Sequence, residues 1–100
     1  MKIWIDDIRP APRGYGVWCM SVNTAKLYIQ TCEHSSIKIE LIDLDHDAGE
    51  YATDGGDYIN LLNWLEETGR KYPIKIHSMN PVGIENMCRI IKKNKWEEIL

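Results

Sequence analysis

The feature that most constrains the fold is an alternation between short apolar segments and segments with helical periodicity. The segments MKIWID, IKIELID and YPIKIHS (residues 1–6, 37–43 and 72–78) are rich in β-branched and apolar residues, which predicts three strands. Elsewhere apolar residues recur at the i, i+3, i+4, i+7 spacing of a half-buried helix, which predicts helices over residues 21–33, 56–68 and from 80 onward. Strands that alternate with helices indicate βαβ units and a mainly parallel sheet.

These elements predict one α/β domain over residues 1–100, a small doubly wound, mainly parallel sheet of four or five strands with three helices. Right-handed crossovers are expected to place helices on both faces of the sheet. Residues 17–20 (VWCM) are a candidate for a further short strand. Residues 96–100 (WEEIL) fit either a frayed terminus or a short edge strand. Loops are expected over residues 7–16 and 44–56, which contain several Pro or Gly residues.

The composition argues against several classes of function. A net charge of −3 gives no general attraction to nucleic acid. No run approaches the ~18 apolar residues of a membrane span, and Asp6 and Asp7 come too early for a signal peptide. The three cysteines are odd in number and form no C-x-x-C pair, which suits a reducing compartment. We therefore expect a cytoplasmic protein with no membrane contact.

Polar clusters follow the three predicted strands. They read DD at residues 6–7, DLDHD at residues 43–47 and HSMN at residues 77–80. Ligands of open parallel sheets bind beyond the carboxyl ends of the strands. The three clusters are therefore expected to meet at one edge of the sheet and to form one site.

Asp6, Asp7 and Asp45 are the candidate metal ligands at this edge. Neighbouring carboxylates raise one another's pKa unless a cation is present, and hard cations such as Mg²⁺ or Mn²⁺ take oxygen ligands. The alternative for Asp6 and Asp7 is a polar strand exit without metal. Asp43 lies on the same side of the strand as Asp45. A structural role for Asp43, beneath Asp45 or turned toward a helix, is as compatible with the sequence as a functional one.

His46, His77 and Asp47 are the candidate catalytic residues. His46 fits a surface loop residue, a metal ligand or a proton-transfer group, because histidine titrates near neutrality. His77 fits a packed core residue or, if it faces the crevice, a second histidine across the acidic cluster from His46. Two histidines beside a phosphate suit general acid–base cleavage of a phosphodiester. Asp47 is the expected partner of His46 in catalysis or ligation.

Arg9, Ser78, Asn80 and Gly83 are the candidate phosphate-binding residues. Arginine binds phosphate by charge and hydrogen bonds, although Arg9 is equally compatible with a solvated loop. Ser78 can donate a hydrogen bond to a phosphate oxygen. The helix expected to begin at Asn80 offers free amides to an anion, and Gly83 permits close approach.

Two loop aromatics, Tyr15 and Tyr51, are candidates to line a pocket and to stack on a nucleobase. Local packing is the more common role for a loop aromatic, so both readings remain open.

The motifs at the ends of the predicted strands resemble those of two known families. The acidic pair Asp6–Asp7, Asp45 after a later strand and Ser78 after the next resemble the receiver domain of two-component signalling. The motifs DDIRPAP, LDHDAG, TDGGDY and HSMNPVG, in this order between residues 3 and 91, more closely resemble the cyclic-phosphate processing receiver domains. This resemblance implies a truncated receiver (flavodoxin-like) fold and a role in processing or recognising cyclic phosphates or cyclic nucleotides.

Carried over by position, the resemblance implies functional roles for Asp6, Asp7, Arg9, Asp45, His46, Asp47, His77, Ser78 and Asn80. Asp43 falls in none of the matched motifs. The chain is shorter than a receiver by a strand–helix unit and has no matching lysine after a fifth strand. Ordinary phosphoacceptor signalling is therefore not implied.

The favoured hypothesis is a metal-dependent phosphoesterase that opens a cyclic phosphate or cyclic nucleotide, with Mg²⁺ or Mn²⁺ as cofactor. The first alternative is a non-catalytic module that binds a nucleotide or cyclic-phosphate signal. The second is a degenerate receiver that mediates protein contacts. The expected partner in the first two cases is a small-molecule phosphate.

Overall fold

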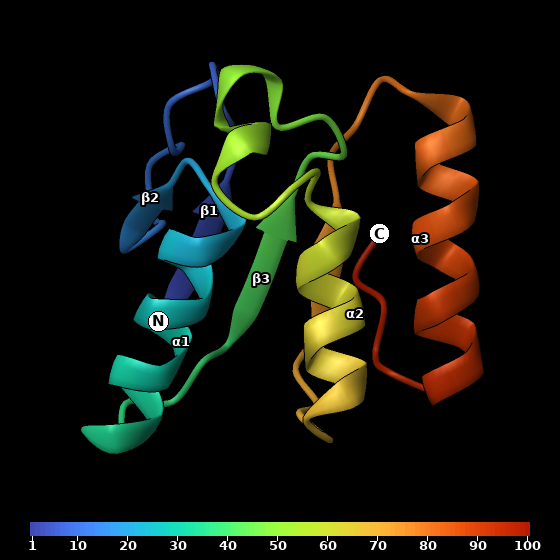
Figure 1. Ribbon diagram of the computed structural model, residues 1–100. Helices are drawn as coiled ribbons and strands as arrows, with labels where there is room; N and C mark the ends of the chain where they lie inside the picture. The colour runs from blue at the N-terminus through green and yellow to red at the C-terminus, as the bar shows by residue number, and fades with distance from the viewer.

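A computed structural model describes residues 1–100, and its centre is a four-stranded parallel sheet (Figure 1). The strands are β1 (Lys2–Ile5), β2 (Val17–Cys19), β3 (Leu41–Leu44) and β4 (Ile74–Ile76). Their spatial order is β2-β1-β3-β4, and every neighbouring pair is parallel. This confirms the predicted α/β class and the candidate strand near residues 17–20.

Three α-helices follow β2, β3 and β4, and their starts have identifiable physical causes. They are α1 (Val22–His34), α2 (Ile59–Glu67) and α3 (Pro81–Asn94). The Ser21 side chain accepts a hydrogen bond from the Thr24 amide, and Asn80 accepts one from the Gly83 amide, so both act as N-caps. Pro81 at the first helical position has no amide hydrogen to leave unpaired.

The predicted boundary of α2 and the predicted loop before it differ from the structure. The helix begins at Ile59 rather than at residue 56, because Gly55 and Gly56 have φ angles of +111° and +86°, outside the helical region. The predicted loop over residues 44–56 contains a 3₁₀ helix, η1 (Gly49–Thr53). The η1 segment lies beside the carboxyl ends of the strands and shapes that edge of the sheet (Figure 1).

The three helices cover one face of the sheet, so the expectation of helices on both faces is wrong (Figure 1). The crossovers from β2 to β3 and from β3 to β4 run in the same direction across the sheet, and right-handedness therefore puts their helices on the same side. Only the β1–β2 connection runs the other way, and it is a loop without a helix.

The hydrophobic core lies between the helices and this covered face. Ile3, Ile5, Ile42, Leu44 and Ile74 point from the strands into the core, where each is fully buried. The helices contribute the buried side chains Val22, Ala25, Ile29, Cys32, Leu61, Leu62, Leu65, Met87 and Ile91. The alternate residues of the strands face the other side, and they build the site described below.

The last residues lie along the edge of the sheet formed by β4. The amide of Ile74 donates to Glu97, the amide of Ile99 donates to Ile74, and a single parallel bridge joins Ile74 to Glu98. Residues 97–99 thus lie beside β4 and are joined to it by one isolated bridge, which falls short of a fifth strand.

None of the helices combines the length and the continuous apolar character that crossing a bilayer requires. Cys19, Cys32 and Cys88 form no disulfide bonds.

Candidate functional site

The alternation of side chains along the strands places a group of polar residues on the face of the sheet that carries no helix. Trp4 is paired with Asp43, and Asp43 with Lys75, across neighbouring strands. Side chains two residues apart share a face. Asp6, Asp45 and His77 therefore continue the rows begun by Trp4, Asp43 and Lys75, and they meet at the carboxyl edge as the sequence suggested.

His77 is held between two buried carboxylates. Its Nδ1 lies 2.6 Å from Asp43 Oδ1, and its Nε2 lies 2.9 Å from Asp6 Oδ2. Asp6 and Asp43 are each 1 % exposed. The imidazole stacks on Trp4 with ring centroids 3.7 Å apart and planes 3° from parallel. Both ring nitrogens of His77 therefore face carboxylate oxygens, which accept hydrogen bonds when ionised.

Asp6 is the most heavily hydrogen-bonded member of the group. Its Oδ1 accepts from the amides of Ile8 and Arg9, both at 2.9 Å, while its Oδ2 faces His77. Burial opposes the charged form, but the two amides and His77 outweigh it, so the Asp6 pKa lies below its ordinary value. Asp6 is therefore held as a carboxylate.

Arg9 joins Asp6 to Asp45. Its Nε lies 3.3 Å from Asp6 Oδ2, and its Nη2 donates to Asp45 Oδ2 at 3.1 Å. The other Asp45 oxygen accepts from the amide of His46 at 2.7 Å. The Arg9 side chain is half exposed, so its guanidinium closes the buried cluster on the solvent side.

Asp43, whose role the sequence left open, proves to be a central member of this network. Tyr15 donates its hydroxyl hydrogen to Asp43 Oδ2, while Asp43 Oδ1 binds His77. A continuous chain of contacts thus runs from Tyr15 through Asp43, His77 and Asp6 to Arg9, and Asp45 lies at its end. The one indication in the sequence was that Asp43 is an acid within an apolar strand. It lies two residues before Asp45 and therefore on the same side of the strand.

Asp7 follows Asp6 directly but has no cationic partner. Its side chain forms no hydrogen bond or ion pair with the protein. Burial, followed by the charges of Asp6 and Asp45, raises its pKa above the ordinary value. Asp7 lines a pocket together with residues of η1, and its carboxylate packs so closely on Gly49 that a Cβ there would overlap it.

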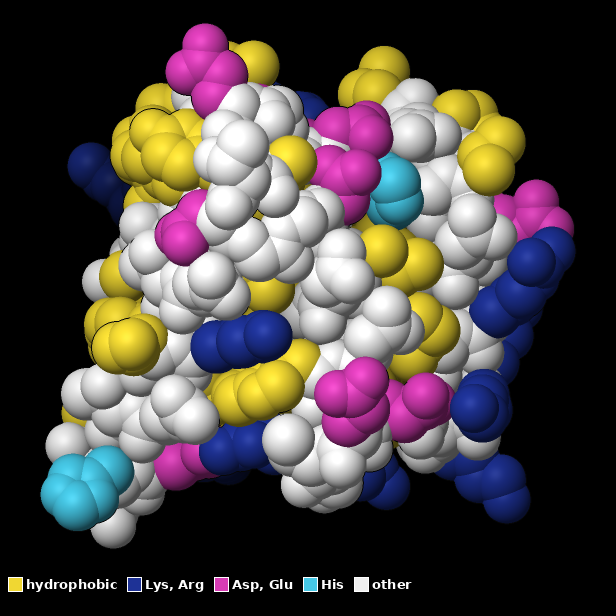
Figure 2. All heavy atoms as spheres, viewed as in Figure 1, with side chains coloured by type: hydrophobic (Ala, Val, Ile, Leu, Met, Phe, Trp, Pro, Cys, Tyr) yellow, Lys and Arg dark blue, Asp and Glu magenta, His cyan; other side chains and the backbone are white.

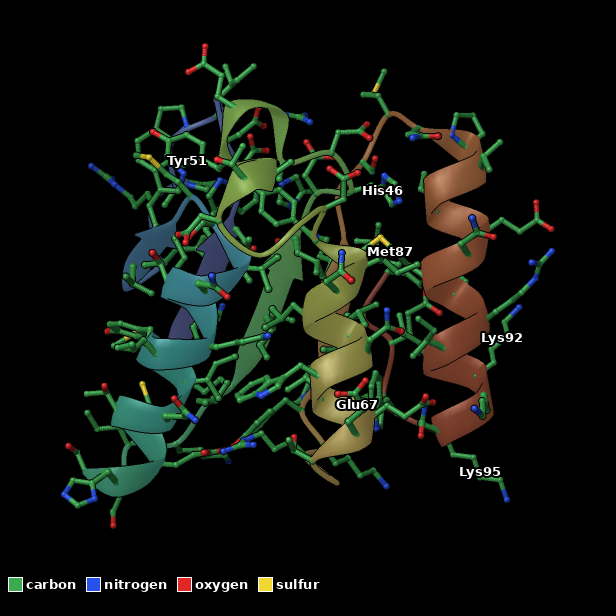
Figure 3. All side chains as sticks on the ribbon, viewed as in Figure 1. His46, Tyr51, Glu67, Met87, Lys92 and Lys95 are labelled. Atoms are coloured by element: carbon green, nitrogen blue, oxygen red, sulfur yellow. The ribbon has the colours of Figure 1, made fainter.

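A second cluster lies between the β3–α2 loop and the start of α3. His46 Nδ1 lies 3.0 Å from Asp47 Oδ1, and the Asn80 side-chain amide is 3.4 Å from Asp47 Oδ2. Ligand atoms of His46, Asp47 and Asp57 lie within 4.8 Å of one another. Figure 2 shows carboxylates beside a histidine at the upper edge of the molecule, and Figure 3 identifies that histidine as His46.

Asp57 was not among the predicted site residues, although it lies in the TDGGDY motif. Its Oδ1 accepts from the Ala48 amide at 2.9 Å, so it holds the turn that carries His46 and Asp47. A loop-internal hydrogen bond of this kind leaves no signature in the sequence.

The two predicted histidines therefore belong to different clusters. Ligand atoms of Asp6, Asp45 and His77 approach within 4.8 Å of one another, and His46 lies with Asp47 and Asp57 instead. The amide of His46, bonded to Asp45, connects the two clusters through the backbone.

The geometry can be compared with known protein families. Residues 1–93 match the family described as the cyclic-phosphate processing receiver domain. The chain belongs to this family. No curated protein and no solved structure matches the chain. The match confirms the resemblance seen in the motifs and associates the chain with cyclic-phosphate processing at the level of the family.

In this receiver domain, the predicted phosphate-binding residues at the start of α3 already have protein partners. Ser78 Oγ accepts from the Asn80 amide at 3.1 Å, and Asn80 Oδ1 accepts from the Gly83 amide at 3.0 Å. Gly83 is buried against the His46 ring, where a Cβ would overlap the imidazole. The close approach that this glycine permits is therefore to His46.

The receiver domain nevertheless brings most of the predicted residues to one edge. Asp6, Arg9, Asp45 and His77 share direct contacts, and His46, Asp47 and Asn80 share a second set. Asp7 is not in the group of close ligand atoms formed by Asp6, Asp45 and His77, although the charges of Asp6 and Asp45 add to burial in raising its pKa.

Proposed function

We propose that this receiver domain is a metal-dependent phosphoesterase that opens a cyclic phosphate or cyclic nucleotide. The observation that supports it is the balance of charge around His77. Asp6, Asp7, Asp43 and Asp45 bring four carboxylates together. Arg9 is the permanent positive charge beside them, and an imidazole of His77 that donates from both nitrogens would add a second. Two negative charges would then remain, which equals the charge of one divalent cation.

Asp6, Asp7 and Asp45 would hold this cation. Their donors are all oxygens, which suits Mg²⁺ or Mn²⁺ better than a softer metal. Asp7 has no competing hydrogen bond, and each Asp45 oxygen accepts only one. Asp6 has less capacity, because its two oxygens already have four contacts. Bound there, the metal supplies charge that polarises the phosphoryl group.

His46 is the residue proposed to transfer the proton. Its Nδ1 faces Asp47, and its Nε2 has no partner in the protein. A carboxylate on one ring nitrogen fixes the orientation of the ring and leaves the other nitrogen for a substrate. The His46 side chain is 16 % exposed, so the ring is partly shielded from solvent but still accessible to a substrate.

His77 is proposed to act through its charge and the position it gives Asp6. Both ring nitrogens are engaged and its side chain is 12 % exposed. Direct proton transfer by His77, the role expected alongside His46, requires one of these two contacts to open. Arg9, half exposed at the rim, is the cation that can turn from Asp45 to a phosphate oxygen.

A panel of substrates tests this proposal. The protein is incubated with 2′,3′-cyclic and 3′,5′-cyclic mononucleotides and with cyclic dinucleotides, in EDTA, Mg²⁺ or Mn²⁺. Phosphorus NMR follows the conversion of each cyclic phosphate to an open monoester. We expect turnover that requires a divalent metal. The absence of turnover with every substrate and every metal would rule out the enzyme.

A second candidate function is a module that binds the same ligands without cleaving them. It is favoured because both ring nitrogens of His77 already have carboxylate partners. A ring with both nitrogens engaged is a stable structural element rather than a free acid or base. Calorimetry that detects binding, with a ligand recovered unchanged, would support this alternative.

Replacement of Asp7 by Asn tests the metal without an activity assay. A carboxylate whose pKa is raised on folding contributes stability below its unfolded pKa and loses it as pH rises through the folded value. The charge of Asp7 is therefore unfavourable at pH 7. Asp7→Asn is expected to increase the metal-free free energy of unfolding by at most about 1 kcal/mol.

The same variant should respond less to metal. Saturation at 100 times the dissociation constant stabilises a folded protein by about 2.7 kcal/mol. Thermal melts with and without Mg²⁺ or Mn²⁺ measure this gain for the natural protein, for Asp7→Asn and for the exposed-site control Glu85→Gln. Equal metal-induced shifts in the natural protein and in Asp7→Asn would exclude Asp7 as a ligand.

A further inference from the structure

A pocket of about 350 Å³ opens beside the proposed metal site. Asp7, Ile8, Gly49, Glu50 and Tyr51 line it. It lies between the end of β1 and η1, at the same upper edge as His46, where Figure 3 labels Tyr51. Pockets for small ligands begin near 300 Å³, so this one has the size for a single planar ring system.

The pocket has an apolar lining with unused hydrogen-bond acceptors. Ile8 is 77 % exposed and Tyr51, in η1, is 38 % exposed, so both have apolar surface available to a ligand. The Glu50 carboxylate and the Tyr51 hydroxyl form no hydrogen bond or ion pair in the protein, and neither does the Asp7 carboxylate. Every charged group of the lining is an acid, and none is a cation.

This chemistry excludes an anion and selects a flat ring with N–H donors. A phosphate in the pocket would face two carboxylates. A nucleobase can instead stack on Tyr51 and donate N–H groups to a carboxylate, which only accepts hydrogen bonds when ionised. The phosphate of the same nucleotide would then lie outward, toward Arg9 and the metal held by Asp7 and Asp45.

We propose that this pocket binds the guanine base of the cyclic nucleotide, with Tyr51 stacking on the ring and Glu50 accepting from it. Guanine carries two adjacent donors, N1–H and the N2 amino group, which match the two oxygens of one carboxylate. On the corresponding edge adenine places an acceptor nitrogen beside its amino group, so one oxygen of Glu50 would face a lone pair. The assignment rests on the proposed function for the cyclic phosphate but not on catalysis.

Binding of GMP, AMP and IMP to the full chain in EDTA tests the assignment. These monophosphates share the phosphate and ribose and contain no cyclic bond, so differences in affinity report on the base. Calorimetry and amide NMR shifts are recorded for the natural protein, Glu50→Gln, Tyr51→Leu and the control Glu85→Gln. The Glu50 and Tyr51 side chains form no hydrogen bonds, so both variants are expected to fold.

We expect GMP to bind about 10-fold more tightly than AMP, with IMP between them, because a bidentate contact discriminates between bases by about this factor. Glu50→Gln should remove this difference without weakening AMP, and Tyr51→Leu should weaken both by about 5-fold or more. Equal affinity of the natural protein for GMP and AMP, no binding of either, or an unchanged preference in Glu50→Gln would overturn the assignment. A preference for GMP without turnover of cyclic substrates would refute only the proposed enzyme.

Discussion

Replacing His77 by Ala is expected to lower the free energy of unfolding at pH 7 by about 3–5 kcal/mol, the usual cost of removing one partner of a buried ion pair. Asp6 and Asp43 are almost completely buried, and His77 contacts both. Without the imidazole, two carboxylates would face each other across a cavity. The stacking on Trp4 would also be lost.

Urea denaturation followed by tryptophan fluorescence measures this loss. His34→Ala is the matched control, because His34 is exposed at the end of α1 and should change stability by less than about 0.5 kcal/mol. A second measurement uses Asp43→Asn and the double variant with His77→Ala. If the two residues form one unit, the double variant should lose much less than the sum of the single losses.

A loss in His77→Ala no larger than that in His34→Ala would contradict the buried ion-pair network. It would mean that the imidazole is neutral and that one carboxylate holds a proton instead. Such a result would also reduce the count of charges from which the metal site is inferred.

The convergence of the site could be predicted because it depends on topology alone. Parallel strands have their carboxyl ends at one edge, and three clusters of acids and histidines follow three recognisable strands. The proximity of Asp45 and His77 follows from this rule together with the two-residue period of a strand.

The face on which the site lies could not be predicted in the same way. The β1–β2 connection contains no helix, and this leaves one face of the sheet to Trp4, Asp43 and Lys75. Tyr15 and Arg9 come from this connection and close the network. The path of a loop rich in Pro and Gly depends on tertiary contacts, such as the indole hydrogen bond from Trp4 to the Arg9 carbonyl.

The division of the histidines was also beyond sequence reasoning. Asp45 and His46 are adjacent, but their side chains leave the strand end in different directions, and one joins each cluster. The His46 ring packs on Gly83 in the first turn of α3, a contact between a loop and a helix that are far apart in the chain. The motif HSMNPVG indicated a phosphate near this glycine, where the structure places the imidazole.

Replacing Asp45 by Asn is expected to reduce metal-dependent turnover of the cyclic phosphate by at least about 100-fold, the range that a positioned catalytic group contributes. Asn keeps the shape of the side chain, and its carbonyl oxygen can still accept from the His46 amide. It loses the charge that binds Arg9 and that would bind the metal. The effect should therefore fall on catalysis and metal affinity rather than on folding.

The comparison with Asp47→Asn separates the two clusters. Asp47 is largely exposed and orients His46, so its replacement should reduce kcat while leaving the metal-induced thermal shift intact. Asp45→Asn should reduce both, and the exposed control Glu85→Gln neither. If Asp45→Asn retained turnover at the natural level, the edge formed by Asp6, Asp45 and His77 would not be the reaction centre. A protein that still cleaves cyclic phosphates would then have to do so at the cluster of His46, Asp47 and Asp57, whose ligand atoms are also close enough to share a cation.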